Sequence, residues 1–225
     1  MEVLFEDNHL IAVNKPAGWL VQGDSTGDTP LAERVKQYIK EKYRKPGEVF
    51  LGVIHRLDRP VSGVVLFART SKALERMNQQ FRERETQKTY RAVVERKPGK
   101  PEDTLIHWLR KDESKNKTAW FSRETPDALR SELSYSILEE ANGFYLLDVR
   151  PITGRPHQIR VQLAAIGCPI VGDLRYGAPS ALDDARIALH ARSLTFIHPV
   201  SKSATAINAP LPDHSVWNQF TSFAR

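Results

Sequence analysis

The sequence predicts an α+β protein with a largely antiparallel mixed central sheet and flanking helices. Residues 64–68, VVLFA, form a short β-branched apolar run without a helical period, which is typical of a strand buried on both faces. Asn142-Gly143 stands between two alternating segments, as in a two-residue hairpin turn. Residues 29–43 and the segment that starts at Ser71 have the apolar spacing of amphipathic helices. A chain of 225 residues can bury one sizeable core, so we expect a single domain over residues 1–225.

Turn and cap residues locate the elements of the N-terminal part. Residues 3–13 contain two β-prone runs around a Glu-Asp-Asn-His turn, which predicts a hairpin. Thr29 is the expected cap of the first helix, with Pro30 at its first position. Ser71 is the expected cap of the second helix. The core stripe of that helix repeats at i, i+3 and i+7 and contains Leu74, Met77 and Phe81.

Alternation predicts further strands in the middle of the chain. Residues 88–94, 104–110 and 130–138 read as strands, and residues 110–123 read as an exposed hairpin. Two short strand-like runs follow within residues 186–198. Their histidines are expected to be satisfied within the sheet rather than bound to metal, and they are His190 and His198. After Pro212 the tail predicts a short helix that packs on the domain through Val216, Trp217 and Phe220.

Residues 153–156 read as a turn that leads into a third helix, which ends at Gly167. Pro156 stands near its first position and Gly167 is the expected C-terminal cap. Its core stripe is expected to contain Ile159, Leu163 and Ile166. A second face carries His157, Arg160 and Ala164, so Arg160 is expected to point away from the core face.

Composition limits the class of protein and its partners. The chain has 33 Lys and Arg against 27 Asp and Glu, a net charge of +6, which favours a polyanionic partner, although many basic proteins bind no nucleic acid. Its start, MEVLFEDNHL, lacks a basic segment before a long apolar stretch, and no window approaches the about eighteen apolar residues of a membrane helix. The lone Cys168 excludes an internal disulfide. We therefore expect a cytoplasmic protein with no membrane partner.

Signatures of nucleotide and zinc sites do not occur in the sequence. The patterns GxGxxG, GxxxxGK[ST] and HExxH are all absent. Cys168 by itself cannot form a zinc site. We expect a protein without cofactor or metal.

The chemistry of the chain is concentrated in the loop at residues 55–63, HRLDRPVSG. Pro60 restricts its own φ and moves Arg59 away from the helical region, while Ser62-Gly63 favours a turn. Asp58 is the one acid in this loop and is flanked by two arginines. An Asp in a loop is most often a turn former or a helix cap, and the alternative is a catalytic carboxylate beside a polyanion-binding surface. The loop alone names no reaction.

Five blocks in order extend the pattern over nearly the whole chain. They are NKPAG at 14–18, HRLD at 55–58 with SG at 62–63, KTYRAVV at 88–94, TGRPHQIRVQL at 153–163 with PIVGDLRYG at 169–177, and LHARSLTFIHP at 189–199. These blocks resemble the RluA-type RNA pseudouridine synthases. The chain departs from that family at Pro156, where Thr or Ser is more common, and at Gln162, where His is more common. The resemblance implies the pseudouridine synthase fold, with sheet, helices and loops around a catalytic cleft.

The resemblance also implies roles for individual residues. Asp58 becomes the catalytic carboxylate, Tyr90 the aromatic that stacks on the target base, and Arg160 the partner of Asp58. Read without the family, Tyr90 is equally well a core aromatic, and Arg160 is a phosphate-contacting or solvated arginine. Arg56 is implied to fill the space that the flipped base leaves, or else it clamps a phosphate. The candidate substrate-binding residues lie in or beside these blocks and are Arg56, His55, Lys88, Arg155, His157 and Ile159.

Two further loops are expected to support the site rather than react. Lys15 in the NKPAG block is expected to be a solvated loop lysine, with an RNA contact as the alternative. The GDLRYG segment is expected to shape the cleft, and its Asp173 is the one other acid that merits a test.

The implied activity is the isomerisation of a specific uridine in structured RNA, ribosomal or transfer, to pseudouridine by a cofactor-free monomer. Members of the family often carry a small RNA-binding domain of the S4 type before the first hairpin. We expect no such domain in this protein, so a compact stem-loop is the expected target. Two alternatives stay open: a non-catalytic RNA-binding or ribosome-assembly factor on the same fold, and a glycosidase or nucleoside hydrolase. The last usually needs two carboxylates, and a motif places only Asp58.

Overall fold

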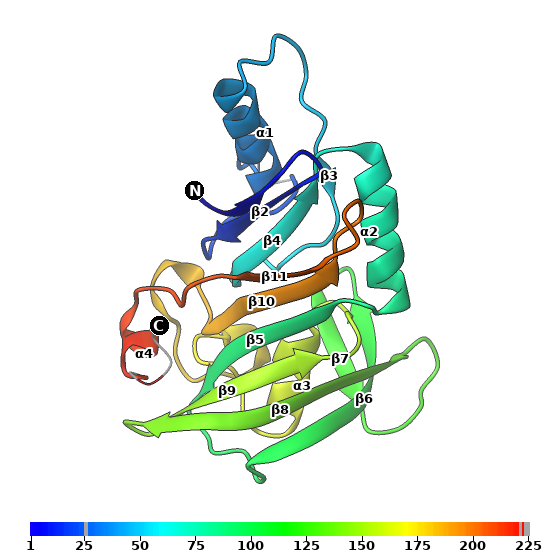
Figure 1. The fold of residues 1–225 in the computed structure, drawn as a ribbon. Coiled ribbons are helices and arrows are strands. Elements are labelled where there is room, and N and C mark those ends of the chain that lie inside the picture. Colours follow the sequence, from blue (N-terminus) through cyan, green and yellow to red (C-terminus); the bar gives the residue numbers. More distant parts are fainter. Residues whose placement is uncertain (25–26, 221, 223–225) are drawn as a thin grey trace. The chain divides into compact units, whose positions relative to one another are not determined.

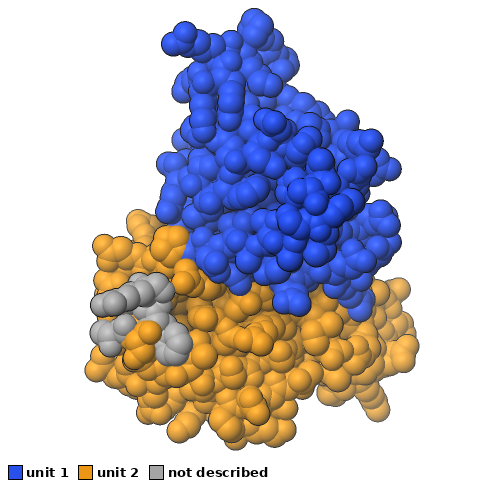
Figure 2. Space-filling view, in the orientation of Figure 1, with its two compact units in different colours: residues 1–87, 193–209 blue, residues 88–192, 210–225 orange. Residues whose placement is uncertain are grey.

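The computed structural model of the protein describes residues 1–24, 27–220 and 222, and it confirms the α+β class (Figure 1). Contacts divide the chain into two compact units. Unit 1 contains residues 1–87 and 193–209, and unit 2 contains residues 88–192 and the segment from residue 210 onward (Figure 2). The expectation of one domain stays a prediction. No helix among the described residues is long and apolar enough to cross a membrane.

Unit 1 is built on antiparallel strands. The predicted N-terminal hairpin is confirmed as β1 (Glu2–Glu6) and β2 (Leu10–Lys15), and β2 pairs with β4 (Ser62–Ala68), which is buried along its whole length. The short β3 (Gly52–Val53) also pairs with β4. The two strand-like runs predicted within residues 186–198 form one strand, β10 (Leu189–Ile197), of which residues 193–197 belong to unit 1. Its partner β11 (Ala204–Asn208) was not predicted.

The two helices of unit 1 begin one residue away from the predicted caps. In α1 (Leu31–Lys42) the cap position is held by Pro30, without a side-chain hydrogen bond, so the prediction for Thr29 was wrong. In α2 (Ser71–Glu83) the Thr70 Oγ1 accepts a hydrogen bond from the Ala73 N–H at 3.2 Å, so Thr70 and not Ser71 is the cap. Met77 is buried as predicted, whereas Leu74 and Phe81 are partly buried at the edge of the core. The strands and α2 pack around one hydrophobic core. It is formed by apolar residues of β2, β4, α2, β10 and β11, among them Leu10, Leu66, Met77, Phe196 and Ile207.

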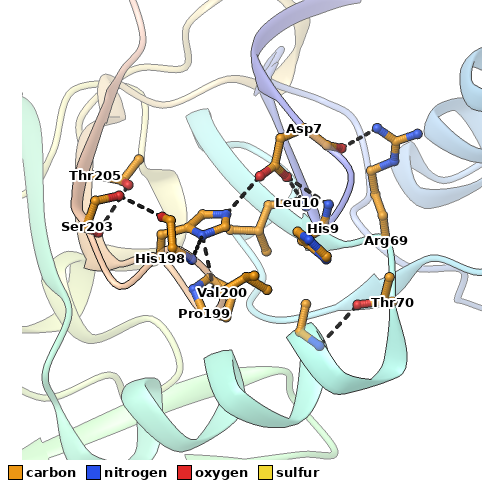
Figure 3. A network of polar contacts seen from close by, with 12 residues as sticks. Asp7, His9, Leu10, Arg69, Thr70, His198, Pro199, Val200, Ser203 and Thr205 are labelled. Atoms are coloured by element: carbon orange, nitrogen blue, oxygen red, sulfur yellow. Dashed lines mark hydrogen bonds and ion pairs between the residues drawn. The ribbon is translucent and has the colours of Figure 1, made fainter.

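A polar network ties the turn of the first hairpin to the turn after β10 (Figure 3). His198 Nε2 lies 2.9 Å from Asp7 Oδ2, and His198 Nδ1 accepts the Ser201 N–H at 3.0 Å. The other Asp7 oxygen accepts the main-chain N–H groups of His9 and Leu10. Burial would raise the pKa of Asp7, but these bonds and His198 lower it below its ordinary value. His198 is thus satisfied by protein groups, as the sequence predicted.

Unit 2 contains a second run of antiparallel strands. Its order is β5 (Gln87–Val94), β9 (Phe144–Pro151), β8 (Leu129–Ala141), β6 (Glu102–Asp112) and β7 (Lys117–Phe121). Asn142 and Gly143 form the β8–β9 turn with φ of 52° and 79°, the left-handed values that such turns require. The predicted strands at 104–110 and 130–138 are confirmed and extend further at both ends.

The helix that carries Arg160 differs from its prediction. It is α3 (Gln158–Ala165), so Pro156 lies before the helix, and His157 holds the cap position with φ of 55°. All residues from Gln158 to Leu163 are buried, so the predicted division into a core face and a separate face that carries Arg160 was wrong. Gly167 ends the helix with φ of 77° and donates to Ala164, as predicted.

The remaining elements of unit 2 are short. They are the 3-10 turns η1 (Leu174–Tyr176) and η2 (Asp183–Ala185) and the C-terminal helix α4 (Ser215–Asn218). The prediction for the tail is confirmed, since Val216, Trp217 and Phe220 are all buried.

Candidate active site

Contacts of His55 with β4 and α2 hold the loop that carries Asp58 in place. His55 Nε2 accepts the Leu66 N–H at 3.0 Å, and its ring stacks on Phe81 at 5.1 Å between centroids. Leu57 is 7% exposed, whereas the Arg56 side chain is exposed and Asp58 is half-buried. The loop therefore has an anchored side, with His55 and Leu57, and an accessible side with Arg56.

The NKPAG turn holds the same loop from a second direction. The Gly18 N–H donates to the Arg59 carbonyl at 2.8 Å, and Arg59 Nε donates back to the Gly18 carbonyl at 3.0 Å. Gly18 has φ of 86°, which only glycine adopts readily. Val61 N–H donates to the Asp58 carbonyl at 3.0 Å, which closes a turn around Arg59. Asp58 thus stands in a backbone segment whose hydrogen bonds fix its position.

Lys15 lies beneath this junction and is fully buried, so the expectation of a solvated lysine was wrong. Its Nζ donates to the carbonyl oxygens of Pro16 at 3.1 Å, Trp19 at 2.7 Å and Arg59 at 3.1 Å. Burial lowers the pKa of Lys15 to about 7, against the attraction of Asp58, which raises it. Three acceptors match the three protons of an ammonium group, so the geometry suits a charged Lys15 next to Asp58.

In unit 2 Tyr90 lies on β5 opposite Val149 of β9, on the face that it shares with Ala92. The Lys88 Nζ lies near Gly154: a Cβ built on that glycine would be 3.6 Å from Nζ. The KTYRAVV strand and the TGRP turn therefore meet within unit 2. Both blocks had been predicted to contribute to one site.

Arg160 forms a buried two-point ion pair. Its Nε lies 2.7 Å from Asp173 Oδ2 and its Nη2 lies 2.9 Å from Asp173 Oδ1. Arg160 is 5% exposed and Asp173 is 1% exposed. The guanidinium carbon also lies 5.1 Å from the centre of the Tyr176 ring. The sequence had marked Asp173 as an acid worth testing, but it had not joined it to Arg160.

The remaining candidates of unit 2 surround the start of α3. His157 Nδ1 lies 2.8 Å from the Tyr176 hydroxyl, and that hydroxyl accepts the Thr118 N–H at 2.8 Å. Burial raises the pKa of Tyr176, although the Thr118 bonds oppose this. The Arg155 N–H donates to Gln158 Oε1 at 3.0 Å, and Ile159 is buried. The α3 block thus brings Arg155, His157, Ile159 and Arg160 together in unit 2.

The predicted site residues fall into one group in each unit. Unit 1 holds His55, Arg56 and Asp58, and sequence reasoning missed their buried neighbour Lys15. Unit 2 holds the others, and there it missed Tyr176 and Thr118. The pairing of Asp58 with Arg160 stays a prediction. Among the described residues no group of three His, Cys, Asp or Glu side chains is arranged to hold a metal ion.

Comparison with known proteins identifies the family. The family model for RNA pseudouridylate synthase matches residues 9–165. A ribosomal large subunit pseudouridine synthase C of Vibrio cholerae is 34% identical over 94% of this chain, which spans 66% of that relative. A tRNA pseudouridine synthase C of Haemophilus influenzae is 33% identical, with 98% of each chain covered.

A solved structure gives the same result for the fold. The human RNA pseudouridylate synthase domain containing 4 superposes with a TM-score of 0.78 at 25% identity, over 94% of this chain and 89% of that one. The chain spans just under two thirds of the length of the first of these relatives. The family model matches most of the chain, and both the sequence relative and the solved structure agree with it. This chain therefore belongs to the RNA pseudouridylate synthase family.

Proposed function

We propose that the protein is an RNA pseudouridine synthase that isomerises a specific uridine in structured RNA. The family supports this activity, and the relatives named above are described as acting on ribosomal and transfer RNA. The observation that carries the proposal is the fixed position of Asp58. The acid of the HRLD block stands on a loop that hydrogen bonds hold from the NKPAG turn and from β4.

The reaction suits an enzyme that acts through positioning. Pseudouridine formation breaks the bond between N1 and C1′, turns the uracil and rejoins it through C5, so no atom is gained or lost. The target base lies inside a stack, and an enzyme reaches it by extruding the nucleotide at a cost of a few kcal/mol. A loop or irregular stem reduces that cost, which favours a compact stem-loop as substrate.

In this proposal Asp58 acts as nucleophile or base on the extruded nucleotide and has to be ionised. Nearby cations stabilise an ionised carboxylate. Lys15, which at a pKa of about 7 is partly protonated at neutral pH, is one such cation within unit 1 in its charged form, and the electrostatic attraction between it and Asp58 supports this role. We propose that Arg160 is the other, because a guanidinium keeps its charge even when buried.

Other residues of the proposal hold the RNA. Tyr90 stacks on the flipped base, and stacking contributes about 1–3 kcal/mol per base. Arg56, exposed at the accessible side of the loop, occupies the space that the base leaves. His55 anchors the loop through its hydrogen bond with Leu66 of β4. In this proposal it also lies next to the substrate. The proposed contacts to the nucleotide and its flanking phosphates come from Lys88, Arg155, His157 and Ile159.

The decisive experiment incubates the purified protein with transcripts of ribosomal and transfer RNA and maps pseudouridine by carbodiimide labelling and primer extension. We expect modified uridine with the wild-type protein, and RNA binding without product for Asp58→Ala and Asp58→Asn. Asp127→Asn is the matched control, because Asp127 is an exposed turn residue with φ of 62°, which Asn accepts. Near-wild-type turnover in either Asp58 variant would refute the role of Asp58. Bound RNA without product in the wild type would favour the non-catalytic alternative, and released uracil would favour a hydrolase.

The identity of the target is a separate question. Sequencing of total RNA from a strain that lacks the gene, compared with its parent, locates the uridine that depends on this protein. A monomer is our proposal for the oligomeric state, and light scattering of the purified protein tests it.

A further inference from the structure

Asp173 binds one edge of the Arg160 guanidinium, the edge formed by Nε and Nη2. Its two oxygens accept from Nε and Nη2 at 2.7 and 2.9 Å, which is the side-on arrangement of a bidentate pair. An arginine offers three nitrogens in one plane. With Nε and Nη2 bound to Asp173, the direction in which Nη1 points is fixed by the protein.

The backbone around Asp173 is itself held in place. The Asp173 carbonyl accepts the N–H groups of Tyr176 at 3.0 Å and Ala178 at 3.1 Å, and the Asp173 N–H donates to Ile170 at 2.9 Å. Gly172 before it has φ of 86°, and a Cβ there would lie 2.8 Å from the Arg186 carbonyl. The carboxylate therefore projects from a backbone that has little freedom to shift.

Tyr176 restrains the guanidinium from its face. The ring centre lies 5.1 Å from the guanidinium carbon, within the range of a cation–π contact. The Tyr176 hydroxyl is fixed in turn, because it accepts the Thr118 N–H of β7 and contacts His157 Nδ1. Asp173 thus holds one edge of Arg160 while Tyr176 covers a face.

Stability alone gives a weak reason for this arrangement. Removing two charges from water costs several kcal/mol per ion, and a buried ion pair is often no more stabilising than apolar residues of similar volume. Both partners are almost fully buried here, at 5% and 1% exposure. What a bidentate pair does supply is a single orientation of the guanidinium plane.

We propose that Asp173 is a positioning residue, which aims Arg160 at the reacting carboxylate with Tyr176 as support. This inference rests on the proposed role of Arg160. It assigns the GDLRYG segment a function in the reaction beyond shaping the surroundings of the site. Because a displacement of 1 Å can cost about 100-fold in rate, a correct charge at an incorrect angle is insufficient.

The first test leaves Asp173 unchanged. In a 1H–15N spectrum of uniformly labelled protein, the Arg160 Nε–H signal is identified by its loss in Arg160→Lys. We expect slow exchange of this proton with water at pH 7.5, because it is bound to a buried carboxylate. Exchange as fast as that of the Nε–H of Arg130, whose side chain is 50% exposed and pairs with Glu132 through Nη1, would overturn the inference.

The second test changes Asp173 and measures pseudouridine formation. For Asp173→Asn we expect kcat to fall about 100-fold with the KM for RNA within threefold, since Arg160 loses its orientation but not its presence. We expect the acid limb of its pH–rate profile to move to higher pH, as in Arg160→Ala, because both changes weaken the stabilisation of an anionic carboxylate. A purely structural role would reduce the amount of folded protein and leave the profile of the remainder unchanged.

Two comparisons complete the design. Asp173→Glu keeps the charge but displaces the carboxylate by one methylene, so we expect it to stay at least about 10-fold below wild type in kcat. Full recovery with Glu would show that charge compensation suffices and would overturn the inference. Asp184→Asn is the matched control on the same stretch, because Asp184 is 78% exposed and pairs with Arg186 at the surface.

The outcomes separate this inference from the proposed function. A wild-type protein that forms no pseudouridine on any transcript would refute the proposed function, whatever the spectrum shows for Arg160. An active wild type with a normal kcat and pH profile in Asp173→Asn would refute the positioning role alone.

Discussion

The Lys15 Nζ donates a hydrogen bond of 3.1 Å to the main-chain carbonyl of Arg59, the residue that follows Asp58. The same carbonyl accepts the Gly18 N–H at 2.8 Å. A buried cation and a glycine turn therefore meet at one oxygen directly beside the proposed catalytic acid. This junction supports a loop that keeps its geometry before RNA binds.

Replacing Lys15 by Met tests this support. Met has a similar length and no charge, so the carbonyls of Pro16, Trp19 and Arg59 lose the Nζ donor, the last keeping only the Gly18 N–H, and Asp58 loses a nearby cation. We expect kcat to fall about 10- to 100-fold, while RNA binding changes little. Gel-shift and single-turnover assays measure the two quantities. Lys36→Met, at an exposed pair with Glu33, is the control, and equal rates in both variants would count against the loop argument.

Lys15 also predicts how stability depends on pH. Burial lowers its pKa from 10.5 to about 7 in the folded protein. Between these values the unfolded chain binds a proton that the folded chain does not, so the free energy of unfolding rises with pH through this window. The slope due to this group is at most about 1.4 kcal/mol per pH unit. Urea unfolding at pH 7.5, 8.5 and 9.5 measures it, and the rise should be smaller in Lys15→Met by the contribution of this group. Parallel curves for the two proteins would contradict the assignment.

Glu6 predicts a second pH dependence of the free energy of unfolding, on the acid side. Its carboxylate accepts from Tyr38 at 3.0 Å, Lys42 at 2.6 Å, Tyr43 at 2.8 Å and Arg69 at 3.1 Å, all within unit 1. Burial raises the pKa of Glu6, but the bonds from Lys42, Tyr43 and Tyr38 lower it below 4.5 overall. The stability that it contributes is complete above pH 4.5 and is lost as pH falls through the folded pKa.

We therefore expect Glu6→Gln to lose about 1–2 kcal/mol of unfolding free energy at pH 7 and to show a flatter decline below pH 4.5. Denaturant titrations at pH 7, 4.5 and 3.5 provide the comparison. Glu33→Gln, whose carboxyl side chain is 53% exposed, should stay close to wild type throughout. A Glu6→Gln curve with the wild-type decline would mean that other carboxylates govern the acid limb.

Much of the fold could be predicted from local sequence signals. The hairpins at Asn142-Gly143 and at the N-terminus and the buried strand at residues 64–68 were predicted correctly, because turn chemistry and apolar runs are local properties. Strand β11 was missed, since ATAIN contains Ala and Asn, which are poor strand formers, and its conformation depends on pairing with β10. Helix α3 was misread because its buried residues surround it on all sides and leave no one-sided period.

The site was predictable as a set of residue types but not as a set of contacts. Asp58, Tyr90 and Arg160 were located by their blocks, whereas the buried state of Lys15 was not expected, because lysines are rarely buried. Its partners are main-chain carbonyls, which have no side-chain signature in a sequence. Asp173 was marked as an acid, but the ion pair with Arg160 spans thirteen residues and depends on the fold of the intervening loop.

Two substitutions of Tyr90 separate the contribution of its ring from that of its hydroxyl. In the proposed function its ring stacks on the flipped base, and we expect its hydroxyl to take part in hydrogen bonding or proton transfer. Tyr90→Ala removes both, so we expect RNA affinity to fall by about 1–3 kcal/mol along with kcat. Tyr90→Phe keeps the ring, so we expect affinity near wild type and a loss confined to kcat. Filter-binding constants and single-turnover rates for the two variants distinguish these effects, and the Phe variant is the matched control for the Ala variant. If Tyr90→Phe turned over at the wild-type rate, stacking alone would account for this residue and the hydroxyl would have no part in the reaction.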